Sequence, residues 1–127
     1  MEKQFVKYDT AIKLKELGFD YKCFGYYLSD GMYYMFEGYT RKNSELLICT
    51  TAPLYQQVIN WLREKHNIHI VATPKIMWPD RMVGTEYENQ IYKDNKTYGD
   101  DGVRDYYETI EWCLEKAINL IENNKNK

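Results

Sequence analysis

Aromatic side chains with a following arginine form the densest group of residues that could bind a ligand. Five tyrosines fall within 14 positions, from Tyr26 to Tyr39, and Arg41 and Lys42 come shortly after them. An aromatic face can stack on a planar ligand or anchor a protein partner, and the two cations could contact a phosphate or an acidic partner. Aromatic residues also suit strands and a core of large side chains, which remains the interpretation for most of them. The candidate ligand-binding residues are Tyr27, Tyr34, Phe36 and Arg41.

Carboxylates in the second half of the chain provide a different candidate chemistry. Pro79-Asp80 followed by Glu86-Tyr87-Glu88 is partly similar to the PD…ExK pattern, in which carboxylates hold a divalent ion and a lysine polarises the phosphate or water. Glu88 stands where that lysine belongs, and short motifs often match by accident. A metal-dependent hydrolase or nuclease using Asp80, Glu86 and Glu88 is therefore an alternative, and no catalytic residue is assigned.

Histidines and cysteines do not have the spacing of a metal or redox site. His66 and His69 lie three positions apart without an H-E-x-x-H motif, whereas a zinc site needs three or four suitable ligands. Cys23, Cys49 and Cys113 are far apart and each is next to an apolar residue, which is typical of buried, reduced thiols. The sequence also lacks a phosphate-binding glycine loop. We therefore expect no metal and no cofactor.

Composition limits the classes of function. The chain has 127 residues and 16% aromatic residues, and its length predicts one domain. Its net charge of −2 argues against nucleic acid as a partner. The N-terminus has no apolar signal segment, and no apolar run approaches the ~20 residues that cross a bilayer. We expect a soluble protein of the cytoplasm (the host cytoplasm if a phage encodes it) with no membrane partner.

Three helices are expected from apolar periodicity and end signals. Asp9 is the expected N-cap of the first helix, and Gly18 ends it. Pro53 opens the second helix, and Asn67 ends it in a left-handed conformation. Asp105 caps the third with capping-box spacing to Glu108. The buried side of this third helix is predicted to consist of Ile110, Cys113, Leu114, Ala117, Ile118 and Ile121.

The strands are expected to begin with an aromatic hairpin over residues 23–37, turning at Asp30-Gly31. A two-residue turn makes the numbers of facing residues sum to 61 and places Tyr27, Tyr34 and Phe36 on one face. Both faces are then apolar or aromatic, so either could be the buried one. Further strands are expected at 46–49 (short and buried), 68–72 and 85–92, with an edge or bulge at Pro74 and a polar loop over 93–102.

These elements predict an α+β fold. Their order is α-β-β-β-α-β-β-α, and helices fit one face of an antiparallel sheet, so we expect a two-layer sandwich with three helices. A single domain is expected over residues 1–122, followed by a frayed polar tail at 123–127.

Two stretches carry a resemblance to known sequences. They are Phe5–Asp20 with Cys23–Tyr27, and Ala52–Gln57 ahead of Trp61–Lys65, and an amphipathic helix closes the chain. Together they resemble a group of small uncharacterised proteins from gut-anaerobe genomes, prophages and phages. The resemblance brings no activity or site residues. It implies a stand-alone accessory protein of a mobile element.

The leading hypothesis is a non-enzymatic binding protein that uses an aromatic hairpin face. Its partner would be a protein or a small nucleotide-like ligand, and one concrete version is counter-defence by sequestering a nucleotide signal. The first alternative is the metal-dependent hydrolase described above. The second is a homo-oligomeric structural or interaction protein whose interface consumes the aromatic residues.

Overall fold

The computed structural model describes residues 4–77, 81–99 and 105–125, with side chains over 4–73, 87–99 and 105–123. The chain forms two compact units, Met1–Trp61 and Leu62–Lys127. Helix α2 (Tyr55–His66) crosses the boundary between them. A single domain over residues 1–122 therefore stays a prediction, and each unit is described by itself.

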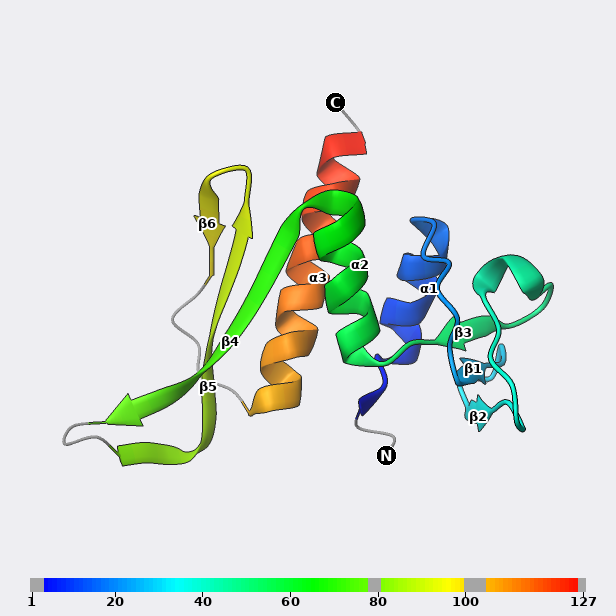
Figure 1. The fold of residues 1–127 in the computed structure, drawn as a ribbon, viewed down its shortest axis with the longest axis horizontal. Helices are drawn as coiled ribbons and strands as arrows, with labels where there is room; N and C mark the ends of the chain where they lie inside the picture. The colour runs from blue at the N-terminus through cyan, green and yellow to red at the C-terminus, as the bar shows by residue number, and fades with distance from the viewer. Residues whose placement is uncertain (1–3, 78–80, 100–104, 126–127) are drawn as a thin grey trace. The chain divides into compact units, whose positions relative to one another are not determined.

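The first unit combines one helix with a small antiparallel sheet. Its strands lie in the order β2-β1-β3, and α1 packs against β3 (Figure 1). Phe19 and Trp61, both buried, pack in a T-shaped arrangement with 5.5 Å between ring centroids, which joins the segment after α1 to the middle of α2. The elements before α2 are α1 (Tyr8–Glu16), β1 (Gly25–Tyr27), β2 (Tyr33–Met35), the 3-10 helix η2 (Asn43–Glu45) and β3 (Thr50–Ala52).

The aromatic hairpin is present, but its predicted register is wrong by one residue. Tyr26 faces Tyr34 and Tyr27 faces Tyr33, so the numbers of facing residues sum to 60. The loop has three residues, because the Leu28 N–H donates to the Met32 carbonyl across it, and Gly31 has φ of +80°. This is the three-residue hairpin loop whose last position is left-handed. A one-residue shift moves side chains to the opposite face.

The segment 46–49 is a loop and not the predicted buried strand. Leu47 and Ile48 are 97% and 87% exposed, and β3 begins only at Thr50. The segment is fixed at both ends, since Lys15 Nζ donates to the Cys49 carbonyl at 2.8 Å and the Asn43 side chain accepts from the Thr51 N–H at 2.9 Å. These hydrogen bonds involve residues far away in sequence, which local apolarity cannot indicate.

The helix ends agree with prediction at three of four signals in this half of the chain. Gly18 follows α1 with φ of +94°, Asn67 follows α2 with φ of 53°, and Pro53 lies two residues ahead of α2. The prediction for Asp9 is wrong, because Lys7 is the N-cap of α1 and makes no side-chain cap hydrogen bond. Asp9 lies in the first turn, where a carboxylate favours the helix dipole.

The second unit contains a long hairpin, β4 (Ile68–Met77) and β5 (Arg81–Lys93), with β6 (Lys96–Tyr98) on the other side of β5. The register shifts between Pro74 and Ile76, which confirms the bulge predicted at Pro74. The loop predicted over 93–102 instead contains β6. Asp94 and Asn95 both have positive φ, which makes the two-residue turn that joins β5 to β6.

Helix α3 (Tyr106–Lys125) covers one face of this sheet, since it contacts both β4 and β5. Buried Ile68, Ile70 and Ile91 alternate with exposed residues on these strands, so the sheet has one apolar face and one open face. The helix extends to Lys125, into the segment predicted as a frayed tail. All six residues predicted for its buried side are at most 4% exposed: Ile110, Cys113, Leu114, Ala117, Ile118 and Ile121.

Asp105 caps α3 as predicted, because its Oδ1 accepts from the Glu108 N–H at 2.8 Å. Replacement of Asp105 by alanine is expected to lower the free energy of unfolding by about 1 kcal/mol. Asp105→Asn should cost less than about 0.5 kcal/mol, since asparagine caps as well as aspartate. Chemical denaturation of the two variants checks this, and equal losses would show that the cap hydrogen bond is not the cause.

The α+β class and the predicted order of helices and strands are confirmed. The strands form two three-stranded antiparallel sheets, and the short strand β6 is added before α3. The third strand of the prediction is present, displaced to Thr50–Ala52.

Candidate functional site: an aromatic face

Four rings gather on the solvent side of the first sheet. Tyr26 stacks on Tyr34 with 5.5 Å between centroids, and Phe36 lies 4.7 Å from Tyr26. Phe36 in turn lies 5.3 Å from Tyr39. Tyr34 is 39% exposed and Tyr39 is 49% exposed, whereas Tyr26 and Phe36 are half-buried between them. We call Tyr26, Tyr34, Phe36 and Tyr39 the aromatic face.

Backbone hydrogen bonds between residues 23–24 and residues 36–41 position the part of the aromatic face that follows β2. The Phe36 N–H donates to the Phe24 carbonyl, and the chain then turns back so that Cys23 and Arg41 exchange two hydrogen bonds of 2.8 and 3.1 Å. The pairing brings the Arg41 guanidinium over the Tyr39 ring, 4.3 Å from its centroid. Arg41 also donates to the Thr40 carbonyl. The cation therefore extends the aromatic face by a cation–π contact.

The structure brings together three of the four predicted ligand-binding residues and separates the fourth. Tyr34, Phe36 and Arg41 belong to the aromatic face or adjoin it. Tyr27 points to the opposite side of β1, where it is 8% exposed and its hydroxyl donates to the Val6 carbonyl at 2.6 Å. Tyr27 therefore belongs to the core. The cause is the three-residue loop, which shifts the register of the hairpin by one residue. Tyr26, rather than Tyr27, therefore lies on the same face as Tyr34.

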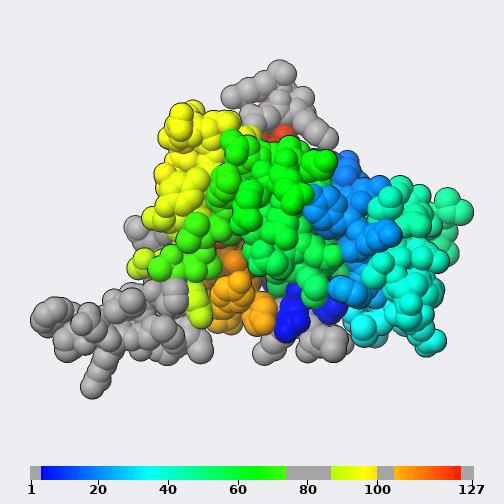
Figure 2. All heavy atoms as spheres, viewed as in Figure 1, coloured from blue at the N-terminus to red at the C-terminus, as the bar shows by residue number. Residues whose placement is uncertain are grey.

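Exposed apolar side chains concentrate in the segment that contains this face. Among the residues with described side chains, seven of the ten large apolar side chains that are exposed belong to residues 24–48. Figure 2 shows much of this segment, in cyan, at the surface. A concentration of exposed apolar side chains is characteristic of interaction sites. The seven are Phe24, Met32, Tyr34, Met35, Tyr39, Leu47 and Ile48.

Sequence reasoning included Tyr26 and Tyr39 in the tyrosine cluster but not among the four candidate ligand-binding residues. It missed Leu47 and Ile48 as surface residues, because it interpreted their segment as a buried strand. For Leu47 and Ile48 the signal that could have separated a loop from a strand is weak: Asn43-Ser44 and Thr50-Thr51 flank the apolar run, and both pairs are common near turns.

The carboxylates of the hydrolase alternative lie only in part within the described residues. Asp80 and the side chain of Glu86 fall outside them, and Glu88 is exposed on β5, paired with Thr73. Over the described side chains, no group of three or more His, Cys, Asp or Glu lies close enough to hold a metal ion.

Cys23 has the environment of an unreactive thiol. It is buried, and Sγ donates to the Tyr21 carbonyl at 3.3 Å. Burial raises the pKa of this thiol from its ordinary value of 9.0 to about 11, while a hydrogen bond with Thr51 acts in the opposite direction. Because the nucleophilic form is the thiolate, Cys23 is protected at neutral pH.

This pKa predicts a loss of stability in alkaline solution. Between pH 9.0 and about 11 the folded chain keeps a proton that the unfolded chain releases, so the free energy of unfolding falls as the pH rises. The difference between the wild type and Cys23→Ala isolates this contribution, which is expected to reach at most about 3 kcal/mol.

The low reactivity of Cys23 has its own test. Iodoacetamide should alkylate Cys23 only after denaturation. Equal alkylation of Cys23 in the folded and the denatured chain at neutral pH would contradict the assignment.

No helix within the described part of the chain has both the length and the apolar character needed to cross a membrane. Comparison with protein-family models, with curated proteins and with solved structures finds no match for the chain.

Proposed function

We propose that this chain is a non-enzymatic binding protein whose aromatic face docks a protein partner. The observation that carries the proposal is the concentration of exposed apolar side chains in residues 24–48, seven of the ten among the described side chains. Tyrosine and arginine are the residue types most enriched where binding energy concentrates at protein interfaces. Tyr34, Tyr39 and Arg41 supply both.

The contacts within the face lower the cost of binding. Each ring of the aromatic face already contacts a neighbouring ring, and Arg41 is held over Tyr39. Side chains that are ordered before binding lose less conformational entropy when a partner arrives. An ordered surface of rings is therefore a better docking site than the same rings on a mobile loop.

The same contacts favour a protein over a nucleotide-like ligand. A stacking base needs a free ring face, whereas Tyr26 is already in contact with both Tyr34 and Phe36. Arg41 is likewise engaged with Tyr39 and the Thr40 carbonyl. A protein partner can instead use ring edges, the Tyr34 hydroxyl and the exposed side chains of Leu47 and Ile48.

The resemblance of residues 5–20, 23–27, 52–57 and 61–65 to small proteins of phages and prophages supports a binding role in an accessory protein of a mobile element. In that setting the partner is a host protein of the cytoplasm, and counter-defence is one such role. The homo-oligomer alternative differs in one respect, since a second copy of the chain would then cover the face.

Site-specific photocrosslinking in the expressing cell tests the proposal. Benzoylphenylalanine at position 34 should give a discrete adduct with a second protein. Position 106 is the matched control, because Tyr106 is 39% exposed, as Tyr34 is, but belongs to α3. The adduct should be lost when Tyr39 and Arg41 are replaced by serine in the same chain.

The other outcomes overturn the proposal. The same adducts from positions 34 and 106 would show that the face has no special role. An adduct of twice the mass of the chain would favour the homo-oligomer. A thermal shift with millimolar mononucleotides or cyclic nucleotides that Tyr34→Ser abolishes would favour the nucleotide-like ligand.

A further inference from the structure

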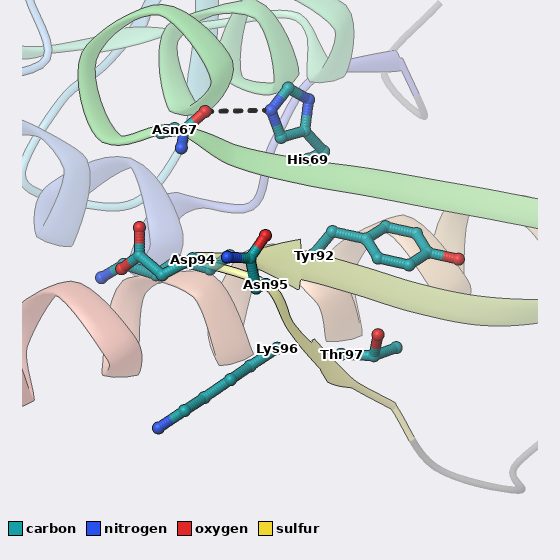
Figure 3. A pocket seen from close by; sticks show the side chains of 8 residues that line it. Asn67, His69, Tyr92, Asp94, Asn95, Lys96 and Thr97 are labelled. Carbon is teal, nitrogen blue, oxygen red and sulfur yellow. Dashed lines mark hydrogen bonds between the residues drawn. The ribbon is translucent and has the colours of Figure 1, made fainter.

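A cavity of about 500 Å³ lies at the turn end of the second sheet, within the second unit. Figure 3 shows its side chains, which come from the start of β4 and from the turn between β5 and β6. Its volume is in the range of small-molecule sites. The residues that matter for its chemistry are Asn67, His69, Tyr92, Asp94, Asn95 and Thr97.

The register of the sheet aligns three of these residues. His69 faces Tyr92 across β4 and β5, and Tyr92 faces Thr97 across β5 and β6. All three are exposed, whereas the neighbouring Ile68 and Ile91 are buried on the other face. An imidazole, a phenol and a hydroxyl therefore form one row across the open face of the sheet.

Both rings in this row are held by a hydrogen bond. His69 Nε2 lies 3.1 Å from Asn67 Oδ1, drawn as the dashed line in Figure 3. The Tyr92 hydroxyl donates to Gln90 Oε1, two residues away on the same strand. The Tyr92 ring stays 40% exposed. The hydrogen bond therefore favours one orientation of the ring, and part of the ring surface remains open to a ligand.

Residues in the left-handed backbone conformation lie around the same cavity. Among the described residues, the non-glycine positions with positive φ are Asn67 (53°), Asp94 (50°) and Asn95 (67°), and all three line it. Asn67 follows the end of α2, and Asp94 and Asn95 form the two-residue turn between β5 and β6, where asparagine and aspartate are favoured. The helix end and the turn therefore place three polar side chains beside the cavity.

Exposed polar side chains in the cavity can form hydrogen bonds with a ligand. The side chains of Asp94, Asn95 and Thr97 line the cavity and are exposed. An amide and a hydroxyl each both donate and accept hydrogen bonds, and a carboxylate accepts several. A ligand with many hydroxyl groups matches this mixture of amides, hydroxyls and one carboxylate. Lys93 and Lys96 also line the cavity, so an anion is the competing ligand that the experiment has to separate from a sugar. In Figure 3 the Lys96 side chain extends away from the other labelled side chains.

We propose that this cavity binds a carbohydrate. The apolar C–H face of a sugar ring packs on the exposed part of the Tyr92 ring, as amphipathic aromatic side chains permit. The sugar hydroxyls then exchange hydrogen bonds with Asp94, Asn95 and Thr97 along the rim. This site is separate from the aromatic face, and it neither requires nor excludes a protein partner there.

NMR titration of the full chain tests the site. Glucose, N-acetylglucosamine, maltose, cellobiose and lactose are each added to about 50 mM, well above a dissociation constant of about 1 mM. We expect at least one sugar to shift the amide signals of Asn67, His69, Tyr92 and residues 94–97. Tyr92→Ala should weaken this binding by about tenfold or more, the change that 1.4 kcal/mol produces.

Two further variants separate binding from folding. Asn95→Gly keeps the left-handed turn and removes only the side-chain amide. It should lower the affinity for the sugar by about threefold or more, since a hydrogen bond contributes roughly 0.5–1.5 kcal/mol. Val71→Ala, on the same open face but outside the cavity, should leave binding unchanged. The proposal is overturned if no sugar shifts these signals. It is also overturned if the shifts persist in Tyr92→Ala, or if only AMP or inorganic phosphate causes them.

Discussion

Replacement of Asn43 by leucine is expected to lower the free energy of unfolding by about 2–4 kcal/mol, because two buried backbone groups then lose their partner. Asn43 Nδ2 donates to the Phe19 carbonyl at 2.8 Å, and Oδ1 accepts from the Thr51 N–H at 2.9 Å. One side chain thus joins the segment after α1, the 3-10 helix η2 and strand β3. The exposed pair Leu47 and Ile48 lies between two of these attachments.

Asn60 provides the matched control for this change. Its Oδ1 accepts from Gln56 Nε2 in an exposed hydrogen bond on α2. Asn60→Leu should therefore change the free energy of unfolding by less than about 0.5 kcal/mol, as surface substitutions usually do. Chemical denaturation measures both variants, and equal losses would show that the buried hydrogen bonds of Asn43 contribute little.

Replacement of Gly25 by alanine is expected to destabilise the first unit by about 1–3 kcal/mol, the usual cost of overpacking. A Cβ at position 25 would lie 2.5 Å from Cε2 of Tyr33 and 2.7 Å from its hydroxyl oxygen. The Tyr33 ring cannot move away freely, because it also packs on Phe5 with 4.7 Å between centroids. The position next to the buried Tyr27 therefore requires glycine.

A double-mutant cycle tests this explanation. Leucine at position 33 lacks the ring atoms that crowd position 25, so Gly25→Ala should cost less than about 0.5 kcal/mol in the Tyr33→Leu background. The coupling free energy is the difference between the two costs. An undiminished cost in the Tyr33→Leu chain would locate the strain in the backbone of β1 and contradict the role given to the Tyr33 ring.

Local chemistry was sufficient to predict the helices and much of the second sheet. The Asp105 cap, the buried stripe of α3 and the left-handed Asn67 each depend on residues within a few positions of one another. Proline has no N–H to donate to a strand ladder, so Pro74 indicated an edge or a bulge, and the register of β4 shifts directly after it. Signals that depend only on neighbouring residues keep the same meaning whatever the rest of the chain contacts.

Long-range contacts decided the rest. Asp30-Gly31 is compatible with a loop of two or three residues, and the choice between them reassigned Tyr27 from the candidate site to the core. The apolar run at 46–49 has the composition of a buried strand, but Asn43 and Lys15 hold its ends so that Leu47 and Ile48 face the solvent. Neither outcome can be read from a window of neighbouring residues.

The role of Asp94-Asn95 was visible in the sequence and was missed. Both residues tolerate positive φ, and they join two short runs in which β-prone residues recur. The polar character of the surrounding segment indicated a loop instead. The same turn now contributes two of the eight residues that line the cavity proposed to bind a carbohydrate.

Hydroxyl-radical footprinting of the 13 tyrosines is the most direct measurement of whether the aromatic face is open in the free chain. Tyr34 and Tyr39 should be oxidised several times faster than Tyr27 and Tyr55, which are 8% and 7% exposed. Light scattering on the same sample identifies any second copy. Protection of Tyr34 and Tyr39 equal to that of Tyr27 would contradict an open docking face, whether the core or another copy of the chain covers it.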